Sequence, residues 1–262
     1  MLAALFWASS SSSNELPSTI EWQSPNYIQK AFNEIALKNE YRKTQQRIIK
    51  WQKPILYKFV YHNLPQNSVV ESLFNKQLQH LQTITQHPIQ LISEQKSIST
   101  KQQMPNLLIH LTKDADYGRI IQQVSKSGVK NIERESNCMG SFALNVQNQI
   151  EQAVVIIPVD HVYSRGLLVA CIVEETTQIM VLPNDSDWVN PSIANDASKI
   201  ELLIGLDHLF LKILYDSNLQ SGMSFTQSQP IINKIISRLQ KNHLIKNAQH
   251  EVNKAELYPL LN

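Results

Sequence analysis

Glycine is scarce in this 262-residue chain, with only 6 residues. Phosphate-binding loops such as G-x-G-x-x-G and the Walker motif need several glycines, because the backbone must approach the phosphate closely. No such motif occurs, which disfavours nucleotide-dependent chemistry. An excess of charge is also missing, since 24 basic and 22 acidic residues leave a formal net charge of +2. That balance gives no electrostatic basis for binding nucleic acid or an anionic membrane.

Long apolar runs are absent as well. No stretch reaches the roughly 20 apolar residues that a membrane span needs, so we predict no transmembrane span. The apolar start Met1–Ala8 and the serines Ser9–Ser13 resemble the second half of a secretory signal, with Ala8 at the cleavage position. A basic n-region is lacking, so a ragged start before a Ser-rich linker is the alternative. We assign residues 1–20 to a signal remnant and linker, and expect a periplasmic or secreted protein.

Only two cysteines occur, Cys138 and Cys171. In a cytosolic protein they would be two buried free thiols. In an exported protein they would form one disulfide. Because the leader and the cysteine pair both indicate an exported protein, we expect the disulfide. It would stabilise the fold by about 3–4 kcal/mol.

Apolar residues make up 42% of the chain and charged residues 18%, as in a soluble globular protein. Hydrophobic periodicity in the first part predicts helices over 27–40, 68–85 and 114–127, the last before a break at Gly128, and strands over 55–61, 89–92, 106–111, 141–146 and 153–159. The last of these strands is nearly all apolar, as expected for a buried strand. The order of elements predicts an α+β domain with its helices grouped on one side of a mixed sheet.

Three helices are predicted in the second part. One runs from Ser164 or Arg165 to about Met180, because Leu182-Pro183 ends it. Another lies within 195–216. The last, Pro230–Lys246, has an apolar and a basic face, which indicates a helix packed on the domain; a membrane-surface or partner helix is the alternative. We place a main domain at 21–225 and a C-terminal helical appendage at 226–262.

One stretch, Cys171–Asp187, combines polar groups with an apolar helix. Glu174 and Gln178 are four residues apart and therefore lie on one helical face, with Glu175 beside them. Such groups are costly in an apolar helix unless they are paired, hydrated or bound to a ligand. Other histidines and acids are less informative. His161 is interpreted as a surface residue, and Asp207-His208 as a capping or surface pair.

The spacing in this stretch resembles the His-Glu-x-x-His-x-x-Gly-x-x-His-Asp motif of metzincin-type zinc peptidases, in which three histidines bind zinc and the glutamate is the general base. Aligned without a gap, Glu174, Gln178 and Asn184 stand at the three histidines, Glu175 at the glutamate, Val181 at the turn glycine and Asp185 at the final acid. Lys50-Trp51 resembles the entry strand of these enzymes. The resemblance implies a zincin-like mixed β-sheet with an active-site-type helix and C-terminal helices.

A second resemblance is closer. The elements Cys171–Gln178, Asn184–Ser186, Pro191–Asp196 and Leu214–Met223 are similar to the hallmarks of an uncharacterised bacterial family, domain of unknown function 2927. The similarity covers roughly residues 135–225. It implies a bacterial protein whose site, if any, lies around these elements.

The replaced histidines change the expected chemistry. Zinc prefers imidazole and thiolate, so Glu174, Gln178 and Asn184 would bind it poorly, and we expect no metal and no cofactor. Oxygens from Asn184 to Asp187 would suit calcium, but an acidic turn or helix cap is the simpler interpretation.

We therefore expect a binding or scaffold protein with a protein or peptide partner in the bacterial envelope. The binding residues would be Gln178, Asn184 and Asp185, together with the two glutamates. The alternative is an atypical hydrolase or peptidase in which Glu174 and Glu175 are catalytic, with or without a metal. Adjacent helical residues point about 100° apart, which argues against both glutamates facing one substrate.

Overall fold

The computed structural model describes residues 21–38, 46–92, 104–125, 136–195, 197–198, 200–254 and 257–258. The predicted leader at 1–20 and the predicted break at Gly128 lie outside these residues. The helices are η1 (Glu21–Gln23, 3₁₀), α1 (Pro25–Leu37), α2 (Ser68–Thr85), α3 (Asp114–Val124), α5 (Val159–Ser164), α6 (Leu168–Gln178), α7 (Gly205–Leu214), α8 (Phe225–Lys241) and α9 (Leu244–Asn253). The strands are β1 (Ile55–Tyr61), β2 (Ile89–Leu91), β3 (Leu107–Thr112), β4 (Met139–Leu144) and β5 (Ile150–Pro158).

The five strands form one mixed sheet in the order β2-β1-β3-β5-β4. Strands β2, β1, β3 and β5 pair in parallel, with Ile109 opposite Val155 in the β3–β5 register. Strand β4 pairs antiparallel with β5 and lies at the edge. The α+β class predicted from the sequence is therefore confirmed, with each predicted strand present to within three residues at either end.

Helices cover both faces of this sheet, so the prediction that they group on one side is wrong. Helices α2 and α6 pack over the face that carries Ile109, Val155 and Ile157 in the main core. Helix α3 covers the opposite face, where its buried residues form a separate cluster with Met139 and Ile156. The physical reason is the apolar run in β5, because a strand that is apolar on both faces must be covered on both.

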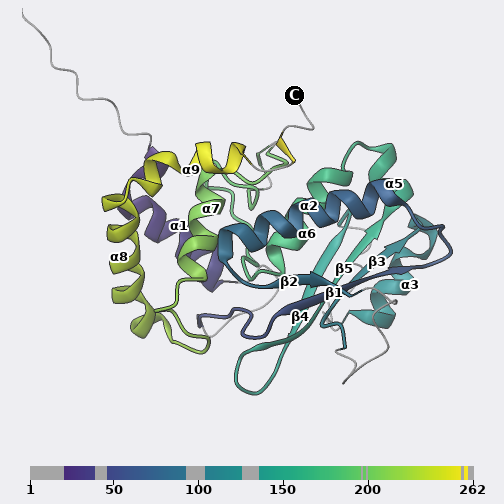
Figure 1. The fold of residues 1–262 in the computed structure, drawn as a ribbon, viewed down its shortest axis with the longest axis horizontal. Coiled ribbons are helices and arrows are strands. Elements are labelled where there is room, and N and C mark those ends of the chain that lie inside the picture. Colours follow the sequence, from purple (N-terminus) through teal and green to yellow (C-terminus); the bar gives the residue numbers. More distant parts are fainter. Residues whose placement is uncertain are drawn as a thin grey trace, which may run out of the picture.

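The remaining helices gather beside the sheet. Figure 1 shows α1, α7, α8 and α9 grouped at the end of the molecule opposite α3. Helix α7 is the centre of this group, since nine of its ten residues are buried. Helix α8 packs on α1, which joins the two ends of the described chain in one core. The predicted boundary after residue 225 falls at the start of α8.

Two predicted helices are each divided in the structure. The helix expected from Ser164 or Arg165 to Met180 is α5 and α6, separated by Gly166, whose φ of 72° a glycine adopts without strain. The helix expected at Pro230–Lys246 begins earlier and ends at Lys241, before His243 at φ 59° opens α9. It begins earlier because Ser224 and Gln227 form a reciprocal capping box ahead of Pro230.

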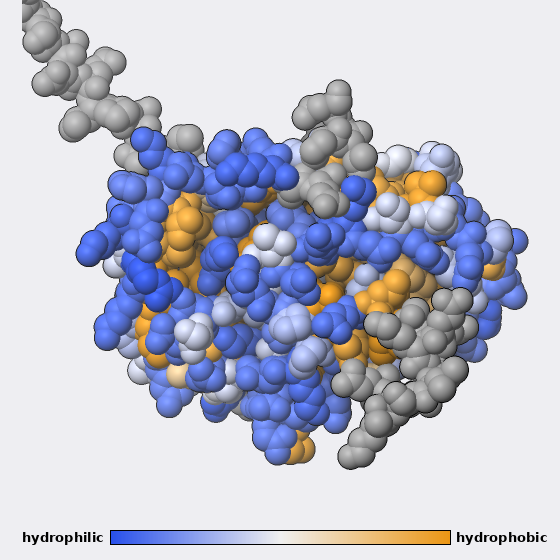
Figure 2. Space-filling view, viewed as in Figure 1, coloured by the Kyte–Doolittle hydropathy of each residue, from blue (hydrophilic) through white to orange (hydrophobic). Residues whose placement is uncertain are grey.

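One face of the molecule has the polar surface expected of a domain in contact with water. In Figure 2 hydrophilic residues predominate, and the hydrophobic surface is broken into separate patches. Helix α8 follows this pattern, with Ile232, Ile235, Ile236 and Leu239 buried and its lysines exposed. No helix in the described ranges is both long and apolar enough to cross a bilayer.

Candidate functional site

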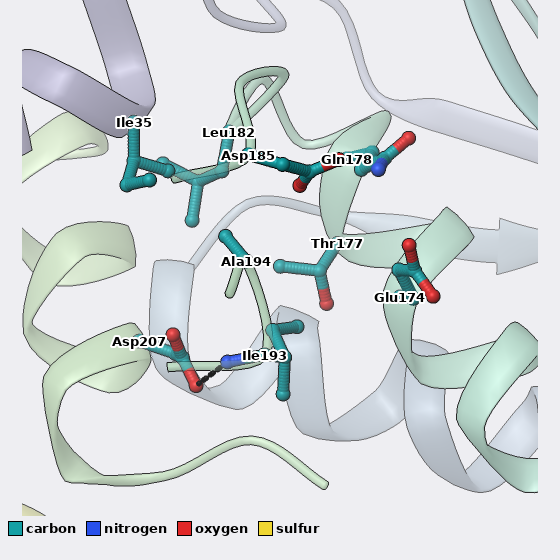
Figure 3. Close-up of a pocket in the computed structure, with 9 residues that line it drawn as sticks. All are labelled: Ile35, Glu174, Thr177, Gln178, Leu182, Asp185, Ile193, Ala194 and Asp207. Atoms are coloured by element: carbon teal, nitrogen blue, oxygen red, sulfur yellow. Dashed lines mark hydrogen bonds between the residues drawn. The ribbon is translucent and has the colours of Figure 1, made fainter. Parts of the chain in front are cut away.

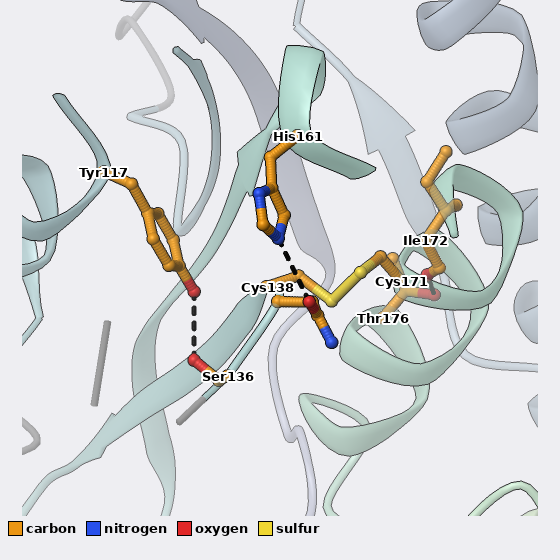
Figure 4. The surroundings of a disulfide bond; sticks show 8 residues. Tyr117, Ser136, Cys138, His161, Cys171, Ile172 and Thr176 are labelled. Carbon is orange, nitrogen blue, oxygen red and sulfur yellow. Dashed lines mark hydrogen bonds between the residues drawn. A yellow bond between two sulfur atoms is a disulfide. The ribbon is translucent and has the colours of Figure 1, made fainter. Parts of the chain in front are cut away.

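The site is built around α6, whose orientation is fixed by a disulfide. Cys138, just before β4, is bonded to Cys171 in the first turn of α6, with 5.9 Å between their Cα atoms (Figure 4). The disulfide predicted from the sequence is therefore present. Cys171 and Glu175 are four residues apart and share a helical face, so the bond turns Glu175 toward β4.

Glu175 and Glu174 consequently face different surroundings. Glu175 is 4% exposed and its carboxylate lies against Gly140 of β4, where an added methyl group would be 2.8 Å from Oε2. Only a residue without a side chain leaves room for this approach. Glu174 is half-buried and lines a pocket on another side of the helix. The two adjacent glutamates therefore do not share one cavity.

The pocket lies between α6, α1 and the segment before α7. It is a shallow depression whose enclosed space is only about 10 Å³, roughly that of one water molecule. Its lining residues are Ile35, Glu174, Thr177, Gln178, Leu182, Asp185, Ile193, Ala194 and Asp207 (Figure 3). In Figure 3, Gln178 and Asp185 lie on one side and Asp207 lies on the opposite side. The structure thus brings together Glu174, Gln178 and Asp185 of the predicted set.

Asn184 does not join them. Its side chain is buried, and Nδ2 donates a 2.9 Å hydrogen bond to the carbonyl oxygen of Asp185. The oxygens that would suit calcium are also dispersed, because Asp185 lines the pocket, Ser186 is buried and Asp187 is exposed. Within the described parts of the chain, no group of three His, Cys, Asp or Glu side chains is arranged to hold a metal.

Zinc, which the metzincin resemblance would imply, does not fit this donor set. The positions of the second and third histidines carry the amides of Gln178 and Asn184, and Asn184 is already engaged with the backbone. Glu175, at the general-base position, is turned to the sheet. Neutral amides are weak ligands for zinc, so the residues present do not form a zinc centre.

The end of α6 is held by two aromatic residues from distant segments. Trp51 donates its indole N–H to the carbonyl of Ile179 over 2.8 Å, and Tyr215 donates its hydroxyl to the carbonyl of Met180 over 3.3 Å. Val181, which follows, has a φ of 72° and is fully buried. A β-branched residue is strained in this left-handed region, so the surrounding packing must enforce the turn.

The segment after this turn, residues 184–195, forms one wall of the site, and we call it the pocket loop. Asp207, at the third position of α7, holds it from one side. Its carboxylate accepts hydrogen bonds from Ser192 Oγ at 2.6 Å, Ile193 N at 3.3 Å and Ile204 N at 3.0 Å. Burial raises the pKa of Asp207 to about 6, against the lowering effect of these hydrogen bonds.

Tyr27 of α1 holds the pocket loop at another point. Its hydroxyl donates to the carbonyl of Asn190 and accepts from the amide N–H of Asn190, both at 2.8 Å. The Tyr27 ring also meets Trp188 edge-on, with 5.8 Å between centroids. The pocket loop is therefore fixed to both α1 and α7.

Several residues of the site are not assigned to it from the sequence, among them Asp207, Tyr27 and Ile35. Asp207 was correctly expected to cap a helix, but it is 1% exposed and not a surface residue. Tyr27 and Ile35 carry no motif, because they reach the site only through the packing of α1. His161 lies away from the pocket, beside the disulfide, where Nε2 is 3.1 Å from Asn137 Oδ1 (Figure 4).

Comparison with known proteins places this chain in a family. The model of the family described as protein of unknown function (DUF2927) matches residues 25–234, so the chain belongs to it. This range begins with α1 and ends within α8, and it includes all residues that line the pocket. No curated protein and no solved structure matches the chain.

Proposed function

We propose that this member of the DUF2927 family is a zincin-like protein with a degenerate metallopeptidase site, and that it binds a protein or peptide in the bacterial envelope without catalysis. Two features, one in α6 and one in the turn after it, support the zincin-like origin. Glu174 and Gln178 occupy one face at the spacing of the first two zinc ligands. Val181, at the position of the turn glycine, has the left-handed backbone that favours glycine.

The divergence of Glu174 and Glu175 is the observation that carries the non-catalytic role. A zinc peptidase needs its glutamate base next to the metal and the bound substrate. Here the glutamate at that position is buried against Gly140, while its neighbour lines the pocket with an amide and aliphatic groups. This lining lacks the base and the metal ligands of the peptidases.

The pocket loop favours binding of a ligand by a preformed surface. Asp207 and Tyr27 fix it in the free protein, so little conformational entropy is lost when a ligand binds. On the face in view in Figure 2 the hydrophobic surface is broken into separate patches, so that face offers no single broad apolar patch for docking. The disulfide supports export, because such bonds persist in oxidising compartments.

Site-specific photo-crosslinking tests this proposal. A benzoylphenylalanine placed at Gln178, beside the pocket, is expected to capture a protein or peptide from a bacterial envelope extract. The same group at Gln79, exposed on α2, is the matched control. Ala194→Trp, which fills the pocket, should abolish the adduct at Gln178. Equal capture at both positions, or capture unaffected by Ala194→Trp, would contradict a pocket-based binding role.

A hydrolase is the second candidate, and a specific observation favours it. Glu174, Asp185 and Asp207 place three carboxyl groups around one pocket, and burial raises the pKa of Asp207 to about 6. A carboxylic acid that keeps its proton near neutral pH is suited to general acid catalysis. Peptide and ester substrates should therefore be screened with the purified chain. Turnover that is lost in Glu174→Gln or Asp185→Asn would replace the binding proposal with this one.

A further inference from the structure

The outer side of α8 carries a line of basic side chains. Lys234, Arg238 and Lys241 follow one another at intervals of four and three residues, so they lie on one side of the helix, and all three are exposed. The opposite side is the buried one, and its apolar residues are Ile232, Ile235, Ile236 and Leu239. The apolar side is therefore used in the core, and the basic line faces solvent.

No acid offsets this line along the chain. Between Asp216 and Glu251 there is no aspartate or glutamate, whereas four basic residues occur, the three of α8 and Lys246 in the first turn of α9. We call these four residues the basic face. The whole chain holds 24 basic and 22 acidic residues, so acids outnumber bases in the remainder. The small net charge of the protein thus conceals an uneven distribution.

The charges of the basic face are also poorly neutralised in space. Arg238 forms an ion pair with Asp216, whose side chain is 10% exposed. Within the described ranges, Lys234, Lys241 and Lys246 form no ion pair. The basic face therefore keeps a local positive charge that its own surroundings do not cancel.

The position of α8 leaves the basic face accessible. Figure 1 shows α8 as the outermost helix at the end of the molecule opposite α3. It packs on α1 and α9 through its buried side. Because the four basic side chains are exposed, no described element covers them. A flat surface can meet this end of the molecule without displacing any part of the fold.

We propose that the basic face docks this domain on a membrane surface that contains anionic lipids. Clusters of four or more lysine and arginine residues on a helix are attracted to anionic headgroups. The contact is electrostatic and peripheral, because the apolar side of α8 is buried in the core and is not available for insertion. The disulfide supports export, and an exported protein meets anionic headgroups at the membrane. This inference goes beyond the proposed function and does not depend on the pocket.

Sedimentation of the full chain with lipid vesicles tests the proposal. The chain should bind vesicles of phosphatidylcholine that contain about 30% phosphatidylglycerol, and it should not bind vesicles of phosphatidylcholine alone. Binding should be lost in about 1 M salt, where the screening length falls to about 3 Å. Equal binding to both kinds of vesicle, or binding that resists salt, would show that apolar residues make the contact and would overturn the proposal.

Matched variants separate the basic face from the net charge of the protein. Each basic residue near an anionic surface strengthens binding about fivefold, so Lys234→Gln/Lys241→Gln should weaken it by about 25-fold. The control Lys53→Gln/Lys113→Gln removes the same charge from two exposed positions outside α8 and α9, and should weaken binding far less. Equal losses in the two double variants would refute docking through the basic face.

A fluorophore sensitive to its environment tests the orientation without altering the charges. Attached at Ser237→Cys, exposed on α8, it should change its emission when phosphatidylglycerol vesicles are added. At Gln122→Cys, exposed on α3, it should not. Retention of the chain on polyglutamate but not on vesicles would replace the membrane with an acidic protein partner. Neither experiment needs the pocket, so its failure would leave the crosslinking result at Gln178 unaffected.

Discussion

The indole N–H of Trp51 donates a 2.8 Å hydrogen bond to the carbonyl of Ile179, across 128 residues of sequence. Trp51 is 2% exposed, so the carbonyl has no ready access to water if the donor is removed. We expect Trp51→Phe to lower the free energy of unfolding by about 1–3 kcal/mol. Urea denaturation measures this loss. Trp188→Phe, at a tryptophan with 37% exposure, should cost clearly less; equal losses would contradict a special role for the bond.

Gly140 is expected to tolerate no side chain. An added methyl group would lie 2.8 Å from Oε2 and 3.1 Å from the backbone oxygen of Glu175, so β4 or α6 would have to shift. Gly140→Ala should therefore destabilise the protein by about 1–3 kcal/mol in urea denaturation. Ser141→Ala, on the same strand, is the control. Combination with Glu175→Ala should recover part of the loss, and strictly additive effects would show that the two residues do not meet.

The disulfide should contribute strongly to stability. Cys138 and Cys171 are separated by 33 positions. The bond restricts the conformations of the denatured chain over this loop, which raises the free energy of unfolding by about 3–4 kcal/mol. We expect the double variant Cys138→Ala/Cys171→Ala to lose this amount, and the reduced wild type to denature at the same urea concentration as the variant. Identical midpoints for oxidised and reduced wild type would contradict the expected contribution.

Asp207 should give stability a measurable pH dependence. Its pKa is raised in the folded protein to about 6 from its usual 3.8, so its contribution is fully present below pH 3.8 and is lost as the pH rises through 6. The stability of the wild type relative to Asp207→Asn should thus decrease by about 2–3 kcal/mol between pH 4 and pH 7. Ser192→Ala retains the carboxylate but removes a hydrogen bond that lowers its pKa, so its slope should be at least as steep. A pH-independent difference would mean that folding does not shift the pKa of Asp207.

Much of the secondary structure follows from the sequence alone. The bounds of β1 and α2 agree with the prediction at every residue, because alternating and helical apolar patterns are local signals with clear ends. Predictions fail where a short feature interrupts a long pattern, as Gly166 does between α5 and α6. The sequence prediction also begins the last helix at Pro230 and misses the capping box of Ser224 and Gln227.

The composition of the site was partly predictable as well. Helical spacing places Glu174 and Gln178 on one face and Glu175 about 100° away, which is a property of the sequence. Spacing does not determine which face meets the sheet and which meets a cavity. The bond between Cys138 and Cys171 and the space above Gly140 decide this, because together they turn Glu175 toward β4.

The sequence by itself therefore determined the class of the fold, the positions of most helices and strands, the pair of cysteines and the polar face of α6. Local periodicity and residue chemistry are sufficient for these features. Only the tertiary structure decided that Asp207 and Tyr27 hold the pocket loop and that Glu175 lies outside the pocket. Those relationships depend on segments far apart in the chain, whose packing is set by the shared core and not by any local pattern.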